Sequence, residues 1–452
     1  MAAPEDGLPG LRSYIQWWLD KAILDQPFAT DSNELGAPNP HIHSILKVPS
    51  DMVTPPPSTP PSRLRSASPR KRRRPDRQQE EGTAPLVQSS PSLSQSSASQ
   101  TTSTRKSTRR SASPVKTFTL QMLRKPVEFV ELADDPDAQL PVEILQLYRD
   151  IYDLAIDRER FIPGGLKKAV KGLVPGVKAR YFSEQDEPYD SSTALRELET
   201  LLEIKADAQL CRSSNASEAA WNSDVHSPLL KIALKPFKKP LLRRHVLTSS
   251  RISSAFIPPM QEGSCYDVAG SNMVDYGIAL HPEDGDPLDL SIRRALAHLP
   301  VHSHHLNQTA YDPLRFAANA VSIETKTGAN GLQEARLQVG IWIAAWFTRM
   351  QQLRRLTIAQ EEERQDKNND QEDGEPSGKM ELLIPVPVVI VIEHEWKLFF
   401  ACDRGNKIDI IGHISIGDTK SLDGLFIIVA VIRRLAAWIQ DDFRTWLVNV
   451  LA

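Results

Sequence analysis

Residues 51–115 place the strongest limit on what this chain can fold into. They contain ten Pro and fifteen Ser but no Phe, Trp, Tyr, Ile or Cys. A segment without large apolar side chains cannot bury enough surface to offset the entropy lost on ordering. We therefore expect a disordered Ser/Pro/Arg-rich linker over residues 31–116. It leaves roughly 330 residues for a folded core, which is enough for one large domain.

Charge is distributed unevenly between this linker and the rest of the chain. Residues 51–115 carry twelve Lys and Arg against four Asp and Glu, a net +8, while the whole chain carries −3, so the remainder carries −11. A uniformly basic coat for nucleic-acid binding is excluded, but a local basic surface is not. The linker contains one basic run, made of Arg70, Lys71, Arg72, Arg73 and Arg74. Such a run suits an importin groove or nucleic-acid phosphates, so we expect nuclear import; the alternative is a solvated linker.

The sequence gives no sign of secretion or of a membrane span. The start, MAAPEDGLPG, has neither a basic nor an apolar signal region. The most apolar stretches, 384–392 and 425–432, are shorter than the roughly 20 residues that cross a bilayer. Three scattered cysteines, Cys211, Cys265 and Cys402, exclude a disulfide framework and a CxxC-type zinc site. We expect an intracellular protein without a membrane partner. It would be nuclear if an importin binds the basic run.

Apolar periodicity divides the chain into three parts. Within residues 1–30, the stripe at 11–24 predicts a short amphipathic helix that either docks on the main domain or binds a partner. Beyond the linker, helical spacing is found at 141–157, 193–208, 215–232, 332–358 and 422–450, and strand-like runs at 272–280, 320–326, 384–402 and 407–416. Composition predicts a disordered acidic loop at 361–379. This order of elements predicts one α/β or α+β domain over residues 117–452.

Acidic side chains lie on two of the predicted strands. Alternation sends Glu324 and Lys326 to one face of their strand, and Asp275 lies on the preceding strand. Two carboxylates a few ångströms apart repel each other, and a divalent cation relieves that repulsion. We therefore expect Asp275 and Glu324 to converge on Mg²⁺, with Mn²⁺ as an alternative ion. Lys326 would stabilise charge developing on a phosphate, which is the chemistry of phosphodiester hydrolysis.

The Glu-x-Lys pattern is weak evidence by itself, because short motifs recur by chance. The chain contains three copies: Glu203/Lys205, Glu324/Lys326 and Glu395/Lys397. The first falls in a predicted helix, where positions i and i+2 do not share a face. The third lies on a plausible strand, but its nearest upstream acids belong to the acidic loop. The middle copy alone follows a strand-borne Asp and precedes a long amphipathic helix. The alternative for it is an exposed salt bridge on a surface strand, which contributes little.

Five sequence blocks in a fixed order carry a family resemblance. They are WNSDVHSPLL (221–230), MVDYGIAL (273–280), LNQTAYDPLRFAANAVSIETK (306–326), EARLQVGIW (334–342) and LFIIVAVIRRLAAWIQDDF (425–443). Over most of residues 117–452 the chain resembles the fungal proteins grouped as a PD-(D/E)XK nuclease-like domain. The resemblance implies a restriction-endonuclease-like core, with a central mixed sheet of about four strands flanked by helices.

The same resemblance implies roles for individual residues. In the wider superfamily the first Asp and the Glu of the second strand bind Mg²⁺, the Lys is catalytic, and a flanking acid or amide assists. By position these are Asp275, Glu324, Lys326 and, on the helix after the second strand, Gln338. Val274 stands where the superfamily pattern has Pro, and the spacing from Asp275 to Glu324 is long.

The predicted helix 215–232 adds two supporting candidates. Glu218, Asn222 and His226 recur every four residues along it, so Asn222 and His226 are candidates to assist the site. The alternative is structural, because Asn215-x-x-Glu218 also fits a helix cap and a helical His is more often packed than catalytic.

A basic stretch after this helix bears on the partner. Candidate phosphate contacts there are Lys235, Lys238, Lys239, Arg243 and Arg244. They favour nucleic acid as the partner, DNA in particular. Because a duplex-binding cleft needs a basic surround and the chain outside the linker is acidic, the competing hypothesis is a catalytically inactive nuclease-fold module that acts in nucleic-acid or protein binding.

Overall fold

The computed structural model describes residues 115–184, 191–262, 273–366 and 383–451. The chain divides into two units, 1–107 and 108–452, and the described residues all belong to the second. The predicted helix within residues 1–30, the basic run Arg70–Arg74 and nearly all of the predicted linker lie outside the described residues. The described part of the second unit begins at Val115, the first residue of helix α2.

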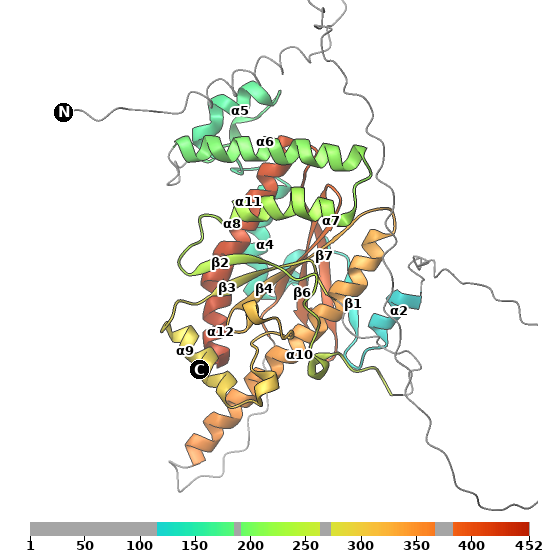
Figure 1. Ribbon diagram of the computed structural model, residues 1–452, viewed down its shortest axis with the longest axis vertical. Helices are drawn as coiled ribbons and strands as arrows, with labels where there is room; N and C mark the ends of the chain where they lie inside the picture. Colours follow the sequence, from blue (N-terminus) through green and yellow to red (C-terminus); the bar gives the residue numbers. More distant parts are fainter. Residues whose placement is uncertain (1–114, 185–190, 263–272, 367–382, 452) are drawn as a thin grey trace, which may run out of the picture. The chain divides into compact units, whose positions relative to one another are not determined.

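A mixed sheet of seven strands forms the centre of the described domain, in the order β1-β7-β6-β5-β4-β3-β2 (Figure 1). The strands are β1 Val127–Val130, β2 Leu241–Val246, β3 Tyr276–His281, β4 Ala318–Lys326, β5 Val386–Ile392, β6 Glu395–Asp403 and β7 Ile408–Asp418. β4 is parallel to β5 and β1 is parallel to β7, while the other neighbouring pairs are antiparallel.

The prediction of about four strands is wrong for identifiable reasons. The apolar region 384–402 is a hairpin of two strands, β5 and β6, rather than one unit. The two edge strands, β1 and β2, were not predicted. β1 is only four residues long, and β2 has the sequence LLRRHV, in which two arginines interrupt the apolar pattern. Edge strands are often short or charged, which blunts the apolar pattern.

Helices surround the sheet. The α-helices are α2 Val115–Gln121, α3 Pro136–Gln139, α4 Val142–Ala155, α5 Lys167–Leu173, α6 Ser191–Ser213, α7 Glu218–Ala220, α8 Ser227–Leu234, α9 Pro287–Ala297, α10 Gly331–Asp366, α11 Leu422–Trp438 and α12 Arg444–Leu451. Two π-helical turns, η3 Trp221–His226 and η7 Ile439–Phe443, and five short 3₁₀ turns complete the described elements: η1 Gly164–Leu166, η2 Ala179–Tyr181, η4 Ser254–Phe256, η5 Val301–Ser303 and η6 Asp312–Leu314. All five helical stretches predicted beyond the linker are therefore present, whereas α2, α3, α5 and α9 were not predicted.

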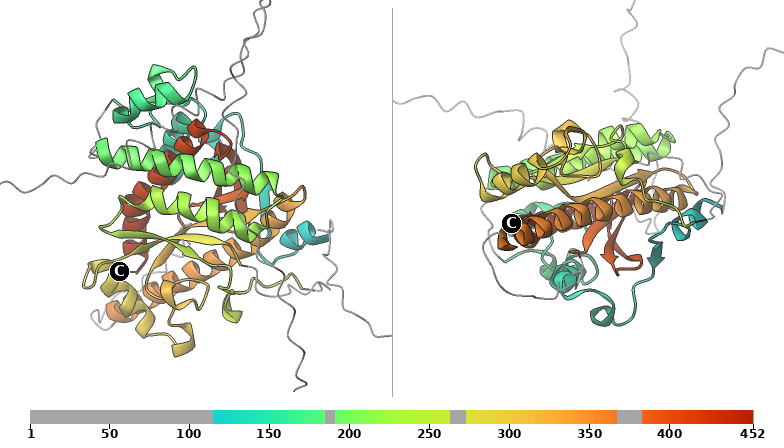
Figure 2. Two further views of the ribbon diagram at one scale, coloured as in Figure 1. Left: turned by 45° about the horizontal axis from the view of Figure 1, so that its top comes forward. Right: turned by 90° about the horizontal axis from the view of Figure 1, so that it is seen from below.

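The sheet is covered on both faces. Figure 1 shows α10 as a long diagonal helix passing the strands, and Figure 2 gives two further views. Side-chain contacts assign the layers. Phe400 of β6 contacts Tyr148 of α4, with ring centroids 6.5 Å apart, whereas the neighbouring Phe399 contacts Phe129, whose ring lies 5.1 Å below Arg336 of α10. Consecutive strand residues point to opposite faces, so α4 and α10 lie on opposite sides.

This double cover explains the composition of the central strands. Every residue of β4 is buried, including its polar ones, because neither face of the strand meets water. Trp342, Trp346 and Phe347 of α10 are at most 2% exposed and belong to the core. They pack against the sheet and do not form an exposed base-stacking platform.

The end of α10 corrects one prediction. The helix continues to Asp366, so residues 361–366 of the predicted acidic loop are helical. Glu, Gln and Arg favour helix in that stretch, and composition alone undervalued this preference. Residues 367–379 lie outside the described part. None of the described helices is long and apolar enough to cross a bilayer.

Candidate functional site

The candidate site is organised around the ammonium group of Lys326, at the end of β4. Its Nζ lies 2.5 Å from Oε1 of Glu324 and 3.3 Å from Oε1 of Glu218, and it donates to the backbone oxygen of Thr325 at 3.0 Å. Glu324 is 1% exposed and Lys326 is 8% exposed. The alternative of an exposed surface salt bridge is therefore wrong for this pair.

The other two Glu-x-Lys copies differ from this one. Glu395 and Lys397 of β6 are 3.8 Å apart, and the Glu395 side chain is 53% exposed. Glu203 and Lys205 lie in helix α6, as expected. Of the three copies, only Glu324/Lys326 is buried, and burial is what makes charges interact strongly.

Negative charge exceeds positive charge around Lys326. Glu218, Asp275 and Glu324 all act on its ammonium, and with every group ionised three carboxylates less one ammonium give a formal charge of −2. Burial by itself would lower the pKa of Lys326, but attraction to Glu324, Glu218 and Asp275 outweighs burial and raises it to about 12. Burial raises the pKa of Glu324 well above its ordinary value, and the charge of Asp275 raises it further.

Asp275 is held by the residue between Glu324 and Lys326. Its Oδ2 accepts the backbone N–H of Thr325 at 2.8 Å and the Thr325 hydroxyl at 2.7 Å. The backbone N–H of Asp275 donates to the oxygen of Ile323, which is already the register partner of Tyr276. This bond ties the residue just before β3 to the neighbouring strand β4.

A buried hydrogen-bond chain extends from Asp275 to His226. The side-chain amide of Asn222 lies 2.8 Å from the Thr325 hydroxyl and 3.0 Å from Nδ1 of His226. Nε2 of His226 lies 3.1 Å from the backbone oxygen of Glu393. Burial is the main cause that lowers the pKa of His226 to about 4, so its ring is neutral at pH 7.

Counting protons assigns the direction of each bond in this chain. The Glu393 carbonyl can only accept, so Nε2 of neutral His226 carries the proton and Nδ1 accepts. Both Asn222 contacts are made at the Oδ1 position, which has no proton to give to an accepting Nδ1, so we assign the amide with its NH₂ turned toward His226 and the Thr325 hydroxyl. The single hydroxyl proton of Thr325 then goes to the Asp275 carboxylate and helps to fix it.

A π-helical turn positions Asn222. The predicted helix 215–232 is found as α7, η3 and α8 in succession, with Asn222 and His226 both in η3. The backbone oxygen of Asn222 accepts a hydrogen bond from the backbone N–H of Ser227, five residues later, and another from the Tyr276 hydroxyl at 2.7 Å. π-Turns inside helices are frequent at functional sites because they shift side chains out of the regular 3.6 period.

Gln338, the remaining site residue predicted from the resemblance, stands apart from this cluster. It lies on α10, and its Oε1 is buried without a hydrogen-bond partner. Among the described residues, it forms no hydrogen bond or ion pair with Glu324, Lys326 or Asp275. The unpaired oxygen is an open acceptor, but its part in the site stays a prediction.

The chemistry of the donors can be tested against a divalent cation. Oε2 of Glu324 is buried and has no hydrogen-bond partner, a costly state for a carboxylate oxygen that a cation would relieve. Carboxylate oxygens are the ligands that Mg²⁺ takes, and the surplus of two negative charges matches its charge. Within the described residues, no three His, Cys, Asp or Glu side chains stand ready as a preformed metal cage. The residues thus fit the ion in chemistry and charge.

Comparison with known proteins adds the family. A family model described as the PD-(D/E)XK nuclease superfamily matches residues 175–444, which is 270 of the 452 residues. The chain belongs to this superfamily. The matched range runs from before α6 to the start of α12 and includes Asp275, Glu324 and Lys326. No curated protein and no solved structure matches the chain significantly.

Two residues of this cluster were not predicted as site residues from the sequence. Thr325 is the variable position of Glu-x-Lys, so the motif gives it no weight. Glu218 was noted for its helical spacing with Asn222 and His226 and as part of a helix cap, although its carboxylate contacts Lys326. The spacing of four residues was a usable signal for Glu218, since it places Glu218 one turn from Asn222. Nothing comparable marks Thr325.

Proposed function

We propose that this PD-(D/E)XK protein is a Mg²⁺-dependent nuclease that hydrolyses phosphodiester bonds in nucleic acid, with Mn²⁺ as an alternative ion. The observation that carries the proposal is the buried carboxylate surplus beside Lys326, with Oε2 of Glu324 left without a partner. Such a surplus is costly to fold, and it is typical of sites that take a cation from solvent.

Each residue has a role in this proposal. Asp275 and Glu324 hold the cation, which when bound lowers the pKa of a coordinated water and neutralises phosphate charge. Thr325 and Asn222 fix the Asp275 carboxylate through the hydrogen bonds described above. Lys326 retains its proton at neutral pH and stabilises negative charge developing on the phosphate, and Glu218 keeps its ammonium near Glu324.

A second candidate is a nuclease fold that binds nucleic acid without turnover. It is favoured by the 2.5 Å contact of Lys326 with Glu324, in which the ammonium already serves as the counter-ion of the carboxylate. Basic side chains that line a groove elsewhere in the domain also favour binding, since none of the three candidate catalytic residues lies among them.

The deciding experiment is plasmid nicking by the purified full-length protein, with Mg²⁺ or with EDTA. Lys326→Ala should slow nicking by about 10²–10³ while binding persists, because the ammonium acts mainly in the transition state. Glu324→Gln should weaken metal binding, so that high Mg²⁺ partly restores activity. The matched controls are Glu395→Gln and Lys397→Ala, which alter the exposed copy of the same motif.

Two outcomes would contradict the nuclease proposal. Nicking that is equal in Mg²⁺ and EDTA would exclude a metal-dependent reaction at this site. Nicking by Lys326→Ala at the wild-type rate under single-turnover conditions would show that the motif is a chance copy. Binding without any nicking in Mg²⁺ or Mn²⁺ would favour the second candidate.

A further inference from the structure

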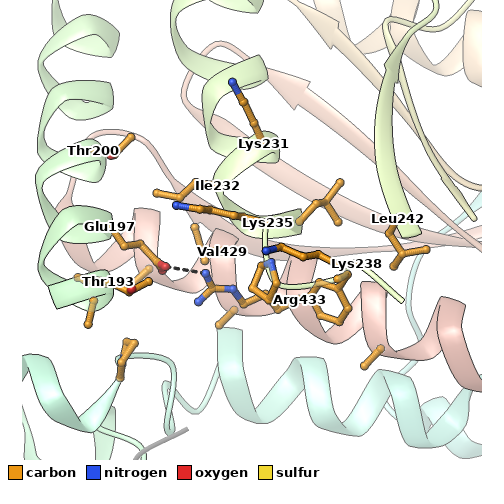
Figure 3. A pocket seen from close by; sticks show the side chains of 18 of the residues that line it. Thr193, Glu197, Thr200, Lys231, Ile232, Lys235, Lys238, Leu242, Val429 and Arg433 are labelled. Atoms are coloured by element: carbon orange, nitrogen blue, oxygen red, sulfur yellow. Dashed lines mark hydrogen bonds and ion pairs between the residues drawn. The ribbon is translucent and has the colours of Figure 1, made fainter. Parts of the chain in front are cut away.

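A large groove lies away from the Lys326 cluster, between helices α6, α8 and α11 and strand β2. Its volume is about 2060 Å³. Figure 3 shows Lys231 of α8, Lys235 directly after this helix and Lys238 further along the chain, together with Glu197 and Arg433, which also line the groove. The α8 and β2 side thus contributes most of the positive charge.

The cations of this groove are largely uncompensated. In the described part of the chain, no carboxylate lies within 4.0 Å of the side-chain nitrogens of five lining residues: Lys231, Lys235, Lys238, Arg243 and Arg244. The lining acid, Glu197, is already paired with Arg433 at 2.8 Å. In addition, Nε of Arg244 is buried without a hydrogen-bond partner. Unpaired cations gathered in one concavity attract a polyanion.

The volume of the groove favours a polymer over a small molecule as its ligand. Sites for small molecules measure roughly 300–1,000 Å³, so this groove exceeds the upper end about twofold. Apolar side chains also line it, among them Phe161, Phe237 and Leu242. A lining of cations and apolar side chains suits a strand that presents both phosphates and sugars or bases.

Helix geometry relates the groove to the candidate site. Asn222 contacts the site from η3, and the same helical segment continues through α8 to Lys231, nine residues later. At 1.5 Å per residue this is about 14 Å along the axis. Phosphates repeat every ~3.4 Å along one strand of a duplex, so the separation is roughly four nucleotides.

We propose that this groove binds the phosphodiester backbone of a nucleic-acid strand, about four nucleotides from the strand's position at the Lys326 cluster. The proposal deepens the proposed function and rests on it for the location of the reacting phosphate. Binding of the nucleic-acid backbone in the groove does not depend on hydrolysis at Lys326. Binding and hydrolysis can therefore be tested separately.

The test measures binding of a fluorescein-labelled 20-nucleotide single strand by anisotropy in EDTA, from 50 to 300 mM salt. The triple variant Lys231→Gln/Lys235→Gln/Lys238→Gln removes three exposed charges from the groove. It should weaken binding at least about tenfold at low salt. It should also reduce the slope of log Kd against log salt by about 2, because each neutralised phosphate of a single strand contributes about 0.7.

The matched control removes the same charge elsewhere. Arg124→Gln/Arg251→Gln/Arg294→Gln alters three exposed residues that do not line the groove. Its Kd and salt slope should stay near wild type. Circular dichroism melts of both variants establish that folding is intact. Equal loss of affinity in the two triple variants, or no loss in the groove variant, would overturn the proposal. So would a heparin probe that loses as much affinity as the nucleic acid, since the groove would then bind any polyanion.

The two proposals fail in different ways. If the protein never nicks plasmid but the groove variant loses binding, the nuclease proposal fails and the groove proposal stands. If the protein nicks and the groove variant binds like wild type, the groove proposal fails alone. Repeating the binding series on Lys326→Ala makes the separation explicit, because that background should keep the groove effect in full.

Discussion

Thr325 donates two hydrogen bonds to one oxygen of Asp275, from its backbone N–H at 2.8 Å and from its hydroxyl at 2.7 Å. The residue between Glu324 and Lys326 thus positions the carboxylate of Asp275, which lies just before the neighbouring strand β3. The same hydroxyl meets Asn222 at 2.8 Å, so Thr325 couples the sheet to η3. The variable position of Glu-x-Lys therefore has a structural role in this chain, because Thr325 orients the Asp275 carboxylate.

Thr325→Val keeps the shape of the side chain but removes its hydroxyl. It should therefore weaken Mg²⁺ binding. Partners that orient a metal ligand typically change affinity 10–100-fold, so the Mg²⁺ concentration for half-maximal nicking should rise by at least about tenfold. The free energy of unfolding should fall by about 1–3 kcal/mol, since buried polar groups lose a partner. Thr325→Ser keeps the hydroxyl and is the control. A Mg²⁺ titration of Thr325→Val that overlays wild type would show that Asp275 needs no such support.

The Glu324–Lys326 pair should show strong energetic coupling. Lys326→Met leaves Glu324 buried among carboxylates without its counter-ion, and such a loss typically costs about 3–5 kcal/mol of folding free energy. Adding Glu324→Gln removes the stranded charge, so the double variant should recover most of the loss. Urea denaturation of the wild type, the two single variants and the double variant measures this cycle in EDTA. Additive single effects would mean that the two side chains do not interact.

His226 should make the protein less stable as the solution is acidified. The folded pKa of His226 is about 4 and the ordinary value is 6.5, so the unfolded chain binds more protons between these pH values. Stability is then retained above pH 6.5 and lost as pH falls toward 4. The loss due to His226 between pH 7.5 and pH 5 is about 2 kcal/mol.

The contribution of His226 is isolated by comparison with His226→Gln, in which the other titrating groups are unchanged. Urea unfolding at both pH values gives the difference between wild type and variant. That difference should shrink by about 2 kcal/mol on acidification, in line with the linkage relation. A difference that is constant with pH would indicate that the ring stays accessible to protons in the folded protein.

Gly331 leaves room for Lys326. A Cβ at Gly331 would lie 2.7 Å from Cβ of Lys326, which is stem rather than flexible tip. Gly331→Ala should therefore cost about 1–3 kcal/mol of stability through overpacking and should slow nicking by displacing Lys326. Gly172→Ala is the contrast, because nothing lies within 4 Å of a Cβ there, and a helical Ala should gain up to about 1 kcal/mol. Thermal melts rank the two, and equal melting temperatures would contradict the steric argument.

Much of the domain follows from local pattern. The helices α4, α6, α10 and α11, and the strands β4 and β7, were predictable because each buries a continuous stripe or run of apolar side chains. β1 and β2 were not, since edge strands carry little apolar signal. The helical residues up to Asp366 were missed because an acidic composition outweighed their helix propensity.

Sequence by itself determined which residues could supply the chemistry: an acid on one strand, Glu324 and Lys326 on the next, and a long helix after them. Only the tertiary structure decided that this copy is buried while Glu395/Lys397 is exposed, because burial depends on which helices cover a strand. It also decided that Asp275 is held by Thr325 and that Glu218 reaches Lys326, residues 50 and 108 positions apart. Contacts over such separations are set by how the elements pack, and no local period in the chain encodes them.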